Sequence, residues 1–146
     1  MADLLADWPD LAADARGLGR RYEEADWRSL LLEPTSCGID TGERPGVVAT
    51  VPAGPYESVD DAVGTGPFGT SHVLWTETGG HRQYLIAVEA RTQELVVVVP
   101  VVLARDAVSS LRERVAEMGS IHTHIEPPAG DRRVTVSHAD PSLFFD

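Results

Sequence analysis

The residues best placed for chemistry lie in a predicted C-terminal hairpin, which joins a strand over residues 120–126 to a strand over residues 132–138. Side chains alternate between the two faces of a strand, so His122, His124 and Arg133 are expected to share one face. Two imidazoles beside a guanidinium suggest a small enzyme or a ligand-binding domain that takes an anionic ligand. The alternative is that both histidines have no functional role and are ordinary strand residues, either exposed or packed at the edge of the sheet.

A metal site is a weaker hypothesis for the same hairpin. His138 lies on the neighbouring strand, but if Ile121 and Val136 share the core face, His138 lies with them and away from the other two histidines. The guanidinium of Arg133 would also repel a divalent cation, and two imidazoles are a poor zinc site. We therefore expect no metal and no cofactor.

Cys37 is the single cysteine, in the segment Thr35-Ser36-Cys37-Gly38. A thiolate there could act as a nucleophile only with a histidine in hydrogen-bond reach, and no local spacing supplies one. An unreactive cysteine in a loop or under the sheet is favoured, although the role of residues 37–69 stays open. A lone cysteine also excludes an intramolecular disulfide and indicates a reducing cytoplasm.

The end of the chain carries two of its three phenylalanines. Leu143, Phe144 and Phe145 are followed only by Asp146. Chain ends fray unless something anchors them. Either this apolar segment folds back into a crevice of its own domain, which we favour, or it docks into another chain as a protein-interaction site.

The charge balance is unusual, because 23 acidic residues face 12 basic ones and all 12 are arginine, for a net charge of -11. At molar salt the Debye length falls to about 3 Å, which screens the repulsion between carboxylates that keep the surface hydrated. The composition therefore predicts the cytoplasm of a halophilic archaeon. The acid excess argues against nucleic acid as a partner, although net charge does not exclude it in an organism whose proteins are all acidic.

Two amphipathic helices are predicted to position these residues. The first has its apolar stripe at Leu4, Trp8, Leu11, Ala15, Leu18 and Tyr22. The second has its stripe at Ala104, Val108, Leu111, Val115 and Met118. Asp7 is the expected N-cap of the first helix, and Gly119 the expected end of the second. Ser58 to Val63 is expected to form a single helical turn.

Short apolar runs predict the strands. They cover residues 27–33, 47–51, 72–78, 81–89, 95–103, 120–126 and 132–138. Gly79-Gly80 predicts a two-residue hairpin turn that places Trp75 opposite Tyr84. Residues 34–45 are rich in turn-forming residues and are expected to be a loop, as is the segment 64–69.

Residues 1–146 are thus expected to form a single α+β domain, with one antiparallel β-sheet made of a meander plus a C-terminal hairpin. The N-terminal helix and the second helix are expected to pack on one face of that sheet. The opening residues show no signal peptide, and the longest apolar run, over residues 95–104, is too short for a membrane span. No membrane partner is expected.

The end of the chain also resembles a family of small uncharacterised haloarchaeal proteins that end in His, an acid and Pro-Ser-Leu-Phe-Phe. The matching residues are His138, Asp140, Pro141, Ser142, Leu143, Phe144 and Phe145. The Thr-His-x-x-Pro segment at 123–127 and the Tyr-Glu-Glu-Ala-x-Trp segment at 22–27 are similar as well. No family pattern covers residues 37–69. The resemblance implies a habitat and no activity, substrate or catalytic residue.

The sequence therefore favours a non-enzymatic interaction or regulatory domain, since no nucleophile, base and metal ligand converge in it. A protein partner, either a second copy or another chain, is the expected ligand. The alternative is the small enzyme or ligand-binding domain that uses the face of His122, His124 and Arg133.

Overall fold

The helices form where apolar residues recur at the spacing that places them on one face of a helix. The computed structural model describes residues 8–64, 68–129 and 132–145. Its α-helices are α1 (Pro9–Glu24), α2 (Ala53–Gly64) and α3 (Arg105–Met118). Pro9 opens α1 at a position where a helix needs no amide hydrogen, and the predicted cap Asp7 lies outside the described residues. Gly119 ends α3 in the left-handed conformation, at φ 72°, as its position predicted.

α2 is longer than the single turn that the sequence predicted. It begins at Ala53, before the predicted cap Ser58, and runs to Gly64. Tyr56, Val59 and Ala62 lie on one side of it and are buried. Packing of this short stripe against the core stabilises turns that intrinsic propensity alone would not hold.

The first sheet contains the predicted meander. Its strands, in spatial order, are β1 (Arg28–Leu31), β6 (Leu95–Ala104), β5 (His81–Ala90) and β4 (Ser71–Thr78). β4 and β5 pair through the Gly79-Gly80 turn, with Trp75 opposite Tyr84 as predicted. β6 is central and nine of its ten residues are buried, which confirms a strand covered on both faces. The 3-10 turn η2 (Arg91–Gln93) connects β5 to β6.

The second sheet contains the C-terminal hairpin and two strands from the middle of the chain. Its order is β2 (Ser36–Asp40), β3 (Gly46–Thr50), β7 (Ile121–Glu126) and β8 (Val134–His138). The expectation that residues 34–45 form a loop was wrong, because β2 lies within them. β2 pairs with β3 over five residues, and this partner compensates for turn-forming residues such as Gly38.

The expectation of one antiparallel sheet was also wrong, because the structure has two mixed sheets. Strands joined by a short connection are antiparallel, namely β4 with β5, β5 with β6, β2 with β3 and β7 with β8. Strands brought together from distant parts of the chain, β1 with β6 and β3 with β7, are parallel. A tight turn forces an antiparallel pair, whereas no local signal sets the direction of a distant one.

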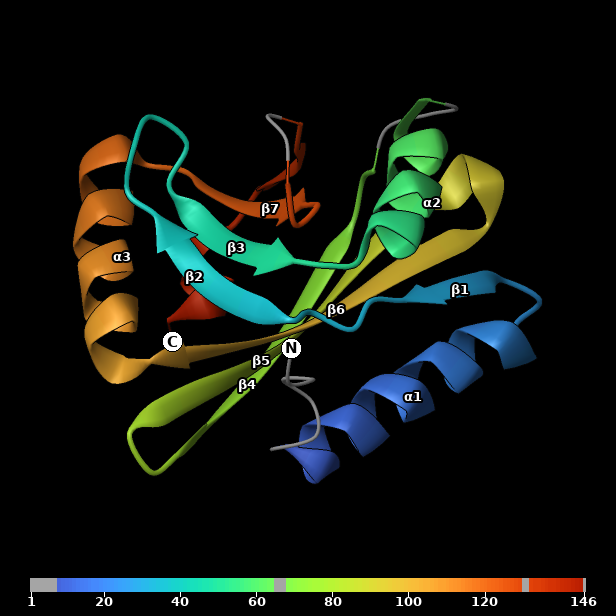
Figure 1. Ribbon diagram of the computed structural model, residues 1–146, viewed down its shortest axis with the longest axis horizontal. Coiled ribbons are helices and arrows are strands. Elements are labelled where there is room, and N and C mark those ends of the chain that lie inside the picture. Colours follow the sequence, from blue (N-terminus) through green and yellow to red (C-terminus); the bar gives the residue numbers. More distant parts are fainter. Residues whose placement is uncertain (1–7, 65–67, 130–131, 146) are drawn as a thin grey trace.

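The main core lies between the two sheets. It contains Tyr84, Ile86 and Val88 of β5, which the hairpin register had placed on the core face. α3 contributes Val108, Leu111 and Val115 to the same core. α3 closes one end of the space between the sheets, and α2 lies toward the other end (Figure 1).

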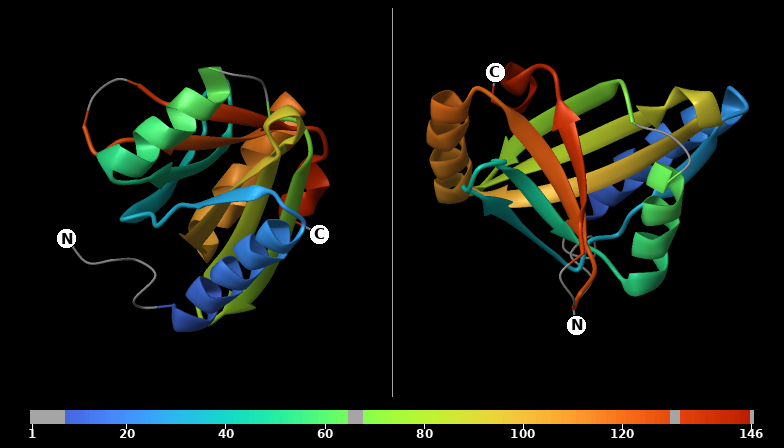
Figure 2. Two further views of the ribbon diagram at one scale, coloured as in Figure 1. Left: turned by 90° about the vertical axis from the view of Figure 1, so that its right-hand side faces the viewer. Right: turned by 90° about the horizontal axis from the view of Figure 1, so that it is seen from above.

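α1 covers the opposite face of the first sheet (Figure 2). Its Leu11, Ala12 and Ala15 pack on Val96 and Val98 of β6 in a second apolar cluster. The two helices therefore do not share one face of a sheet, as the sequence had suggested. Since β6 is apolar on both of its faces, each face needs its own cover, and the two helices take different ones.

One close backbone contact joins the halves of the second sheet and yields a prediction. A Cβ atom at Gly46 would lie 1.9 Å from the carbonyl oxygen of His122, closer than any real contact. Gly46→Ala is therefore expected to lower the free energy of unfolding by about 1–3 kcal/mol through overpacking. Gly38→Ala is the control, because its Cβ would meet nothing within 4 Å. Equal denaturation midpoints for the two variants would contradict this account of Gly46.

Candidate functional site

The register of the hairpin places the three strand histidines on the faces that the sequence predicted. His122 pairs with Ser137 and His124 with Thr135, while Ile121 pairs with His138. His122 and His124 therefore share the outer face, where their rings stack with centroids 5.9 Å apart. The inner face carries His138. Thus the hairpin does not bring the three imidazoles together.

The rings of His122 and His124 are buried rather than open to a ligand, at 8% and 1% exposure. Backbone carbonyls from the segment before β3 cover them. The Nε2–H group of His124 donates to the carbonyl of Arg44 at 2.8 Å, and Nδ1–H of His122 donates to that of Pro45 at 3.2 Å. The Thr135 hydroxyl donates to Nδ1 of His124 at 2.9 Å. Both nitrogens of His124 are therefore used within the chain, and burial lowers its pKa.

Arg133 lies beside this face and forms two ion pairs. Its guanidinium contacts the carboxylates of Asp40 and Glu126, each at 2.8 Å. The hydrogen bond to Asp40 is the main cause of the raised pKa of Arg133, and the amide of Gly42 is the main cause of the lowered pKa of Asp40. The neighbouring hollow, of about 310 Å³, is shallow. An anionic ligand here would have to displace two carboxylates.

Cys37 lines the same hollow. Burial raises the pKa of its thiol to about 11, so little thiolate forms near neutral pH. The thiol side chain also packs partly against the main core. Cys37 therefore has the environment of an unreactive cysteine. Within the described ranges, no group of three or more His, Cys, Asp or Glu side chains gathers in a way that could hold a metal ion.

The C-terminal segment folds back onto its own chain. Residues Pro141–Phe144 form the 3-10 turn η3, and Phe144 and Phe145 are 0% and 9% exposed. The carbonyl of Phe144 accepts hydrogen bonds from Arg82 and from the Tyr84 hydroxyl, both at 3.0 Å. This intramolecular packing is the first of the two alternatives that the sequence left open for Leu143 to Phe145.

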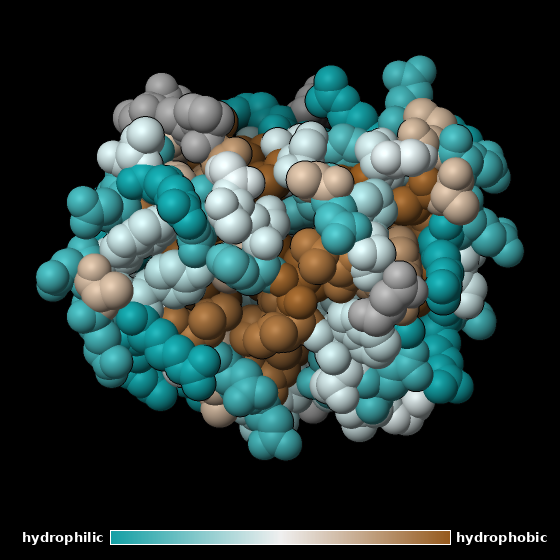
Figure 3. All heavy atoms as spheres, turned by 180° about the vertical axis from the view of Figure 1, so that it is seen from behind, coloured by the Kyte–Doolittle hydropathy of each residue, from teal (hydrophilic) through white to brown (hydrophobic). Residues whose placement is uncertain are grey.

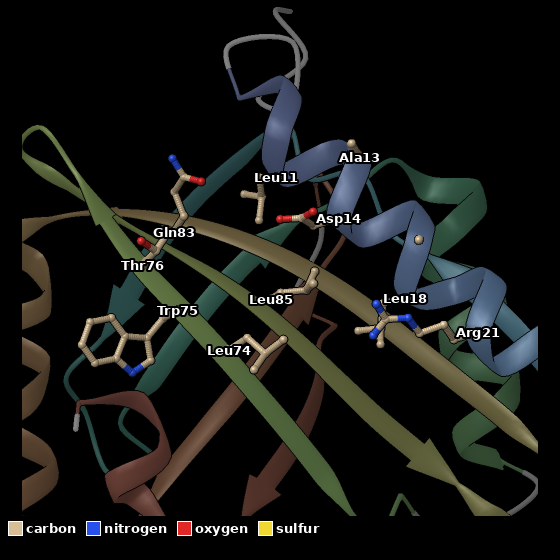
Figure 4. Close-up of a pocket in the computed structure, with 11 residues that line it drawn as sticks. Leu11, Ala13, Asp14, Leu18, Arg21, Leu74, Trp75, Thr76, Gln83 and Leu85 are labelled. Carbon is tan, nitrogen blue, oxygen red and sulfur yellow. The ribbon is translucent and has the colours of Figure 1, made fainter.

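An apolar groove between α1 and β4 is the feature that sequence reasoning missed. The groove has a volume of about 370 Å³, and its floor includes Leu85 of β5 (Figure 4). Leu11 and Leu18 of α1 form one wall, and Leu74 of β4, which is 63% exposed, forms the other. The sequence contained one indication of the groove, because Leu74 and Leu85 share the outward face of the β4–β5 hairpin with polar residues. Nothing in the sequence showed that α1 would leave Leu74 exposed.

Contacts between α1 and the hairpin bound the groove at both ends. At one end the rings of Trp8 and His81 meet with centroids 5.5 Å apart. At the other end the Tyr22 hydroxyl donates to Glu89 at 2.6 Å, and Nε2–H of His72 donates to the same carboxylate at 3.1 Å. Burial would raise the pKa of Glu89, but these hydrogen bonds outweigh it and the pKa is lowered. The ionised carboxylate thus ties α1 to both β5 and β4.

The fold and this groove define an α+β protein of two mixed sheets, with an open apolar surface beside its first helix. The chain belongs to a family of unknown function, DUF7529, whose model matches residues 2–146. No curated protein and no solved structure matches it. The resemblance noted in the sequence predicted such a family, while the haloarchaeal origin stays a prediction. No helix in the described part of the chain is long and apolar enough to cross a membrane.

The buried histidine of the inner face predicts acid sensitivity. His138 contacts the hydroxyls of Thr123 and Ser71 at 2.7 and 2.8 Å, and burial lowers its pKa from 6.5 to about 4. Between these values the unfolded chain binds the proton more readily than the folded one. The free energy of unfolding is therefore expected to fall, by about 3 kcal/mol in total, as the pH drops through this window.

Denaturant titrations of wild type and His138→Gln from pH 7 to pH 4.5 check this expectation. The glutamine variant should lose stability less steeply, because it has no proton to bind. The matched control is His81→Gln at the exposed hairpin turn, which should keep the wild-type slope. The same pH dependence in all three proteins would refute the role of His138.

The anchored tail gives a third stability prediction. The side chain of Phe144 contacts the rings of Tyr84 and His138 in the main core. Phe144→Ala is expected to lower the free energy of unfolding by about 3–5 kcal/mol, because it leaves a cavity there. Leu74→Ala, at an exposed position, should change it by no more than about 0.5 kcal/mol. Chemical denaturation measures both, and a small effect at Phe144 would mean that the tail packs loosely.

Proposed function

We propose that this protein is a non-enzymatic interaction domain of a halophilic archaeon, and that it binds a partner protein through the groove between α1 and β4. The observation that carries the proposal is an apolar groove beside an edge strand, with Leu74 left 63% exposed. Contiguous apolar surface that lines an open groove is typical of protein-binding sites.

The incomplete cover of the first sheet supports this proposal. α1 contacts β1 and β6 extensively, β5 only at a few positions, and β4 hardly at all. The outward face of β4 is therefore left to solvent, whereas Leu85 and Ala87 on the same face of β5 are buried. Viewed from behind, the molecule shows apolar side chains near the middle of its surface, surrounded by hydrophilic ones (Figure 3). An apolar centre within a polar rim is the arrangement found in interfaces.

The charge distribution supports a halophilic origin. Several arginines are held in ion pairs, such as Arg132 with Glu57 and Asp60 on α2, and Arg105 with Glu77 on β4. With 23 acidic and 12 basic residues, many carboxylates are left over to hydrate the surface. At molar salt the attraction between distant charges is screened, so apolar contact becomes the main source of affinity for a partner.

The alternative function, a ligand site at His122, His124 and Arg133, has less support. The imidazoles are covered by backbone carbonyls, and the guanidinium is paired with two carboxylates. Binding an anion would break these contacts before forming new ones, which costs free energy. The groove requires no such rearrangement.

A pair of matched variants tests the proposed function. Leu74→Glu places a charge in the groove, whereas Met118→Glu changes an equally apolar side chain, 40% exposed, at the end of α3. Tagged proteins are purified at about 1 M KCl from cells that express them, and bound protein is quantified. Leu74→Glu should retain about tenfold less partner than wild type, because a buried charge weakens binding by more than 1.4 kcal/mol. Met118→Glu should retain the wild-type amount.

If both variants retain the wild-type amount of partner, or if both lose it, the groove is excluded as the binding surface. Circular dichroism of each variant at the same salt concentration establishes that it is folded before binding is compared.

A further inference from the structure

One edge of the first sheet is formed by β4, which pairs with β5 on one side only. Thr78 and His81 flank the two-residue turn, and the amide of Glu89 donates to the carbonyl of Thr70 at 2.8 Å, so the even-numbered residues of β4 bond to β5. The odd-numbered residues direct their amides and carbonyls to the free edge, namely Ser71, Val73, Trp75 and Glu77. In the described part of the chain, none of these edge groups has a hydrogen-bond partner.

The strand β4 lacks the features that protect exposed sheet edges. It contains no proline and no lysine, and no bulge interrupts its register with β5. Its titratable residues, His72 and Glu77, lie near its two ends, and Glu77 is ion-paired with Arg82. The turn η3 packs over the inner face, where the carbonyl of Phe144 accepts hydrogen bonds from Arg82 and Tyr84. An edge strand of this length and apolar character is a template for pairing with another strand.

The order of polar and apolar residues along β4 is the same in both directions from Leu74. On each side of Leu74 stands one apolar residue and then two polar ones, in the sequence Ser71-His72-Val73-Leu74-Trp75-Thr76-Glu77. The strand therefore matches its own reversed copy. A two-fold interface needs such a self-complementary surface, because each subunit presents the same patch to the other.

One antiparallel register uses this symmetry. A two-fold axis perpendicular to the sheet keeps each residue on its own face, so the axis must pass through a residue and not between two residues. With the axis at Leu74, this leucine meets Leu74 of a second copy, and Val73 meets Trp75. An axis at Trp75 would place Val73 opposite Glu77, and an axis at Val73 would place Leu74 opposite His72. Apolar cross-strand pairs stabilise a sheet, which favours the axis at Leu74.

The same register uses the free backbone groups of the edge. Val73 pairs with Trp75 of the second copy, and Ser71 pairs with Glu77, and each pair exchanges two N–H···O bonds. These are the odd-numbered residues whose amides and carbonyls point away from β5. Pairing would also cover Leu74, which is 63% exposed, and the half-buried side chains of Val73 and Trp75.

We infer that two copies of this chain pair through the free edges of β4, antiparallel and with a two-fold axis at Leu74, which joins their four-stranded sheets into one. This inference concerns the edge of β4 and goes beyond the proposed function, which concerns the groove between α1 and β4. Because the axis is perpendicular to the sheet, the grooves of the two copies lie on the same face of the dimer.

Cysteine crosslinking on the full chain tests the register. Leu74→Cys, His72→Cys and Thr76→Cys are prepared in a Cys37→Ala background and oxidised at about 1 M KCl, where charge attraction between copies is screened. Leu74→Cys should form a disulfide-linked dimer, because the Cα atoms of a non-hydrogen-bonded pair lie about 4.5 Å apart, within disulfide range.

The other two positions give the matched controls. In the inferred register His72 faces Thr76 of the second copy, so a mixture of His72→Cys and Thr76→Cys should also crosslink. Each of these variants alone should stay unlinked, because its two cysteines would lie about 13 Å apart along the strands. Met118→Cys, at a 40% exposed position on α3, measures random collision.

The mass in solution gives an independent test. Sedimentation equilibrium at the same salt concentration should show a wild-type dimer. Val73→Pro removes an amide at the free edge that β5 does not use, a position where an edge strand tolerates proline. Val73→Ala shortens the same side chain and keeps the amide. The dimer dissociation constant of the proline variant should be at least about tenfold above that of the alanine variant. Circular dichroism establishes that both are folded.

Each contrary result overturns the inference. Wild-type protein that is monomeric at every concentration would do so, and so would equal dissociation constants for folded Val73→Pro and Val73→Ala. If the proline variant does not fold, crosslinking decides: Leu74→Cys that links no faster than Met118→Cys, or His72→Cys that links by itself, excludes the register. None of these results affects the proposed function, because Val73 does not line the groove and partner recovery is measured separately.

Discussion

Burial of β6 on both faces is the constraint on which the rest of the structure depends. Its nine buried residues are all apolar, and six of them are valine, so each face must be covered by another layer. One face meets the second sheet and α3, and the other meets α1. α1 packs across β1, β6 and β5 and does not reach the edge strand β4, whose outward face is left exposed. The groove is therefore a consequence of covering β6 with only one helix.

The polar side chains that the sequence suggested as ligand-binding residues stabilise the fold instead. In the described ranges, every buried side-chain nitrogen or oxygen has a hydrogen-bond partner. Burying a polar group is costly unless it is paired, and each histidine of the hairpin meets this requirement with a carbonyl or a hydroxyl. These contacts join segments that are distant in sequence, such as Pro45 to His122. Their role is to hold the second sheet together.

Much of the fold could be predicted where a local signal sets the structure. The Gly79-Gly80 turn specified the β4–β5 register, and Gly119 specified the end of α3. The alternation of side chains also separated His138 from His122 and His124. β2 was missed because its turn-forming residues suit a loop as well as a strand, and only pairing with β3 decides between them. The groove was missed because the exposure of Leu74 depends on where α1 lies.

The sequence by itself determined the α+β class, most element boundaries, the acidic surface and the core face of each hairpin, because these follow from spacing and composition. Only the tertiary structure decided that the strands form two mixed sheets, that the histidines are covered, and that an apolar face is open beside α1. The physical reason is the same in each case. Local signals act over one turn or one hairpin, whereas the direction of distant strands and the cover of a sheet face depend on how separate segments pack.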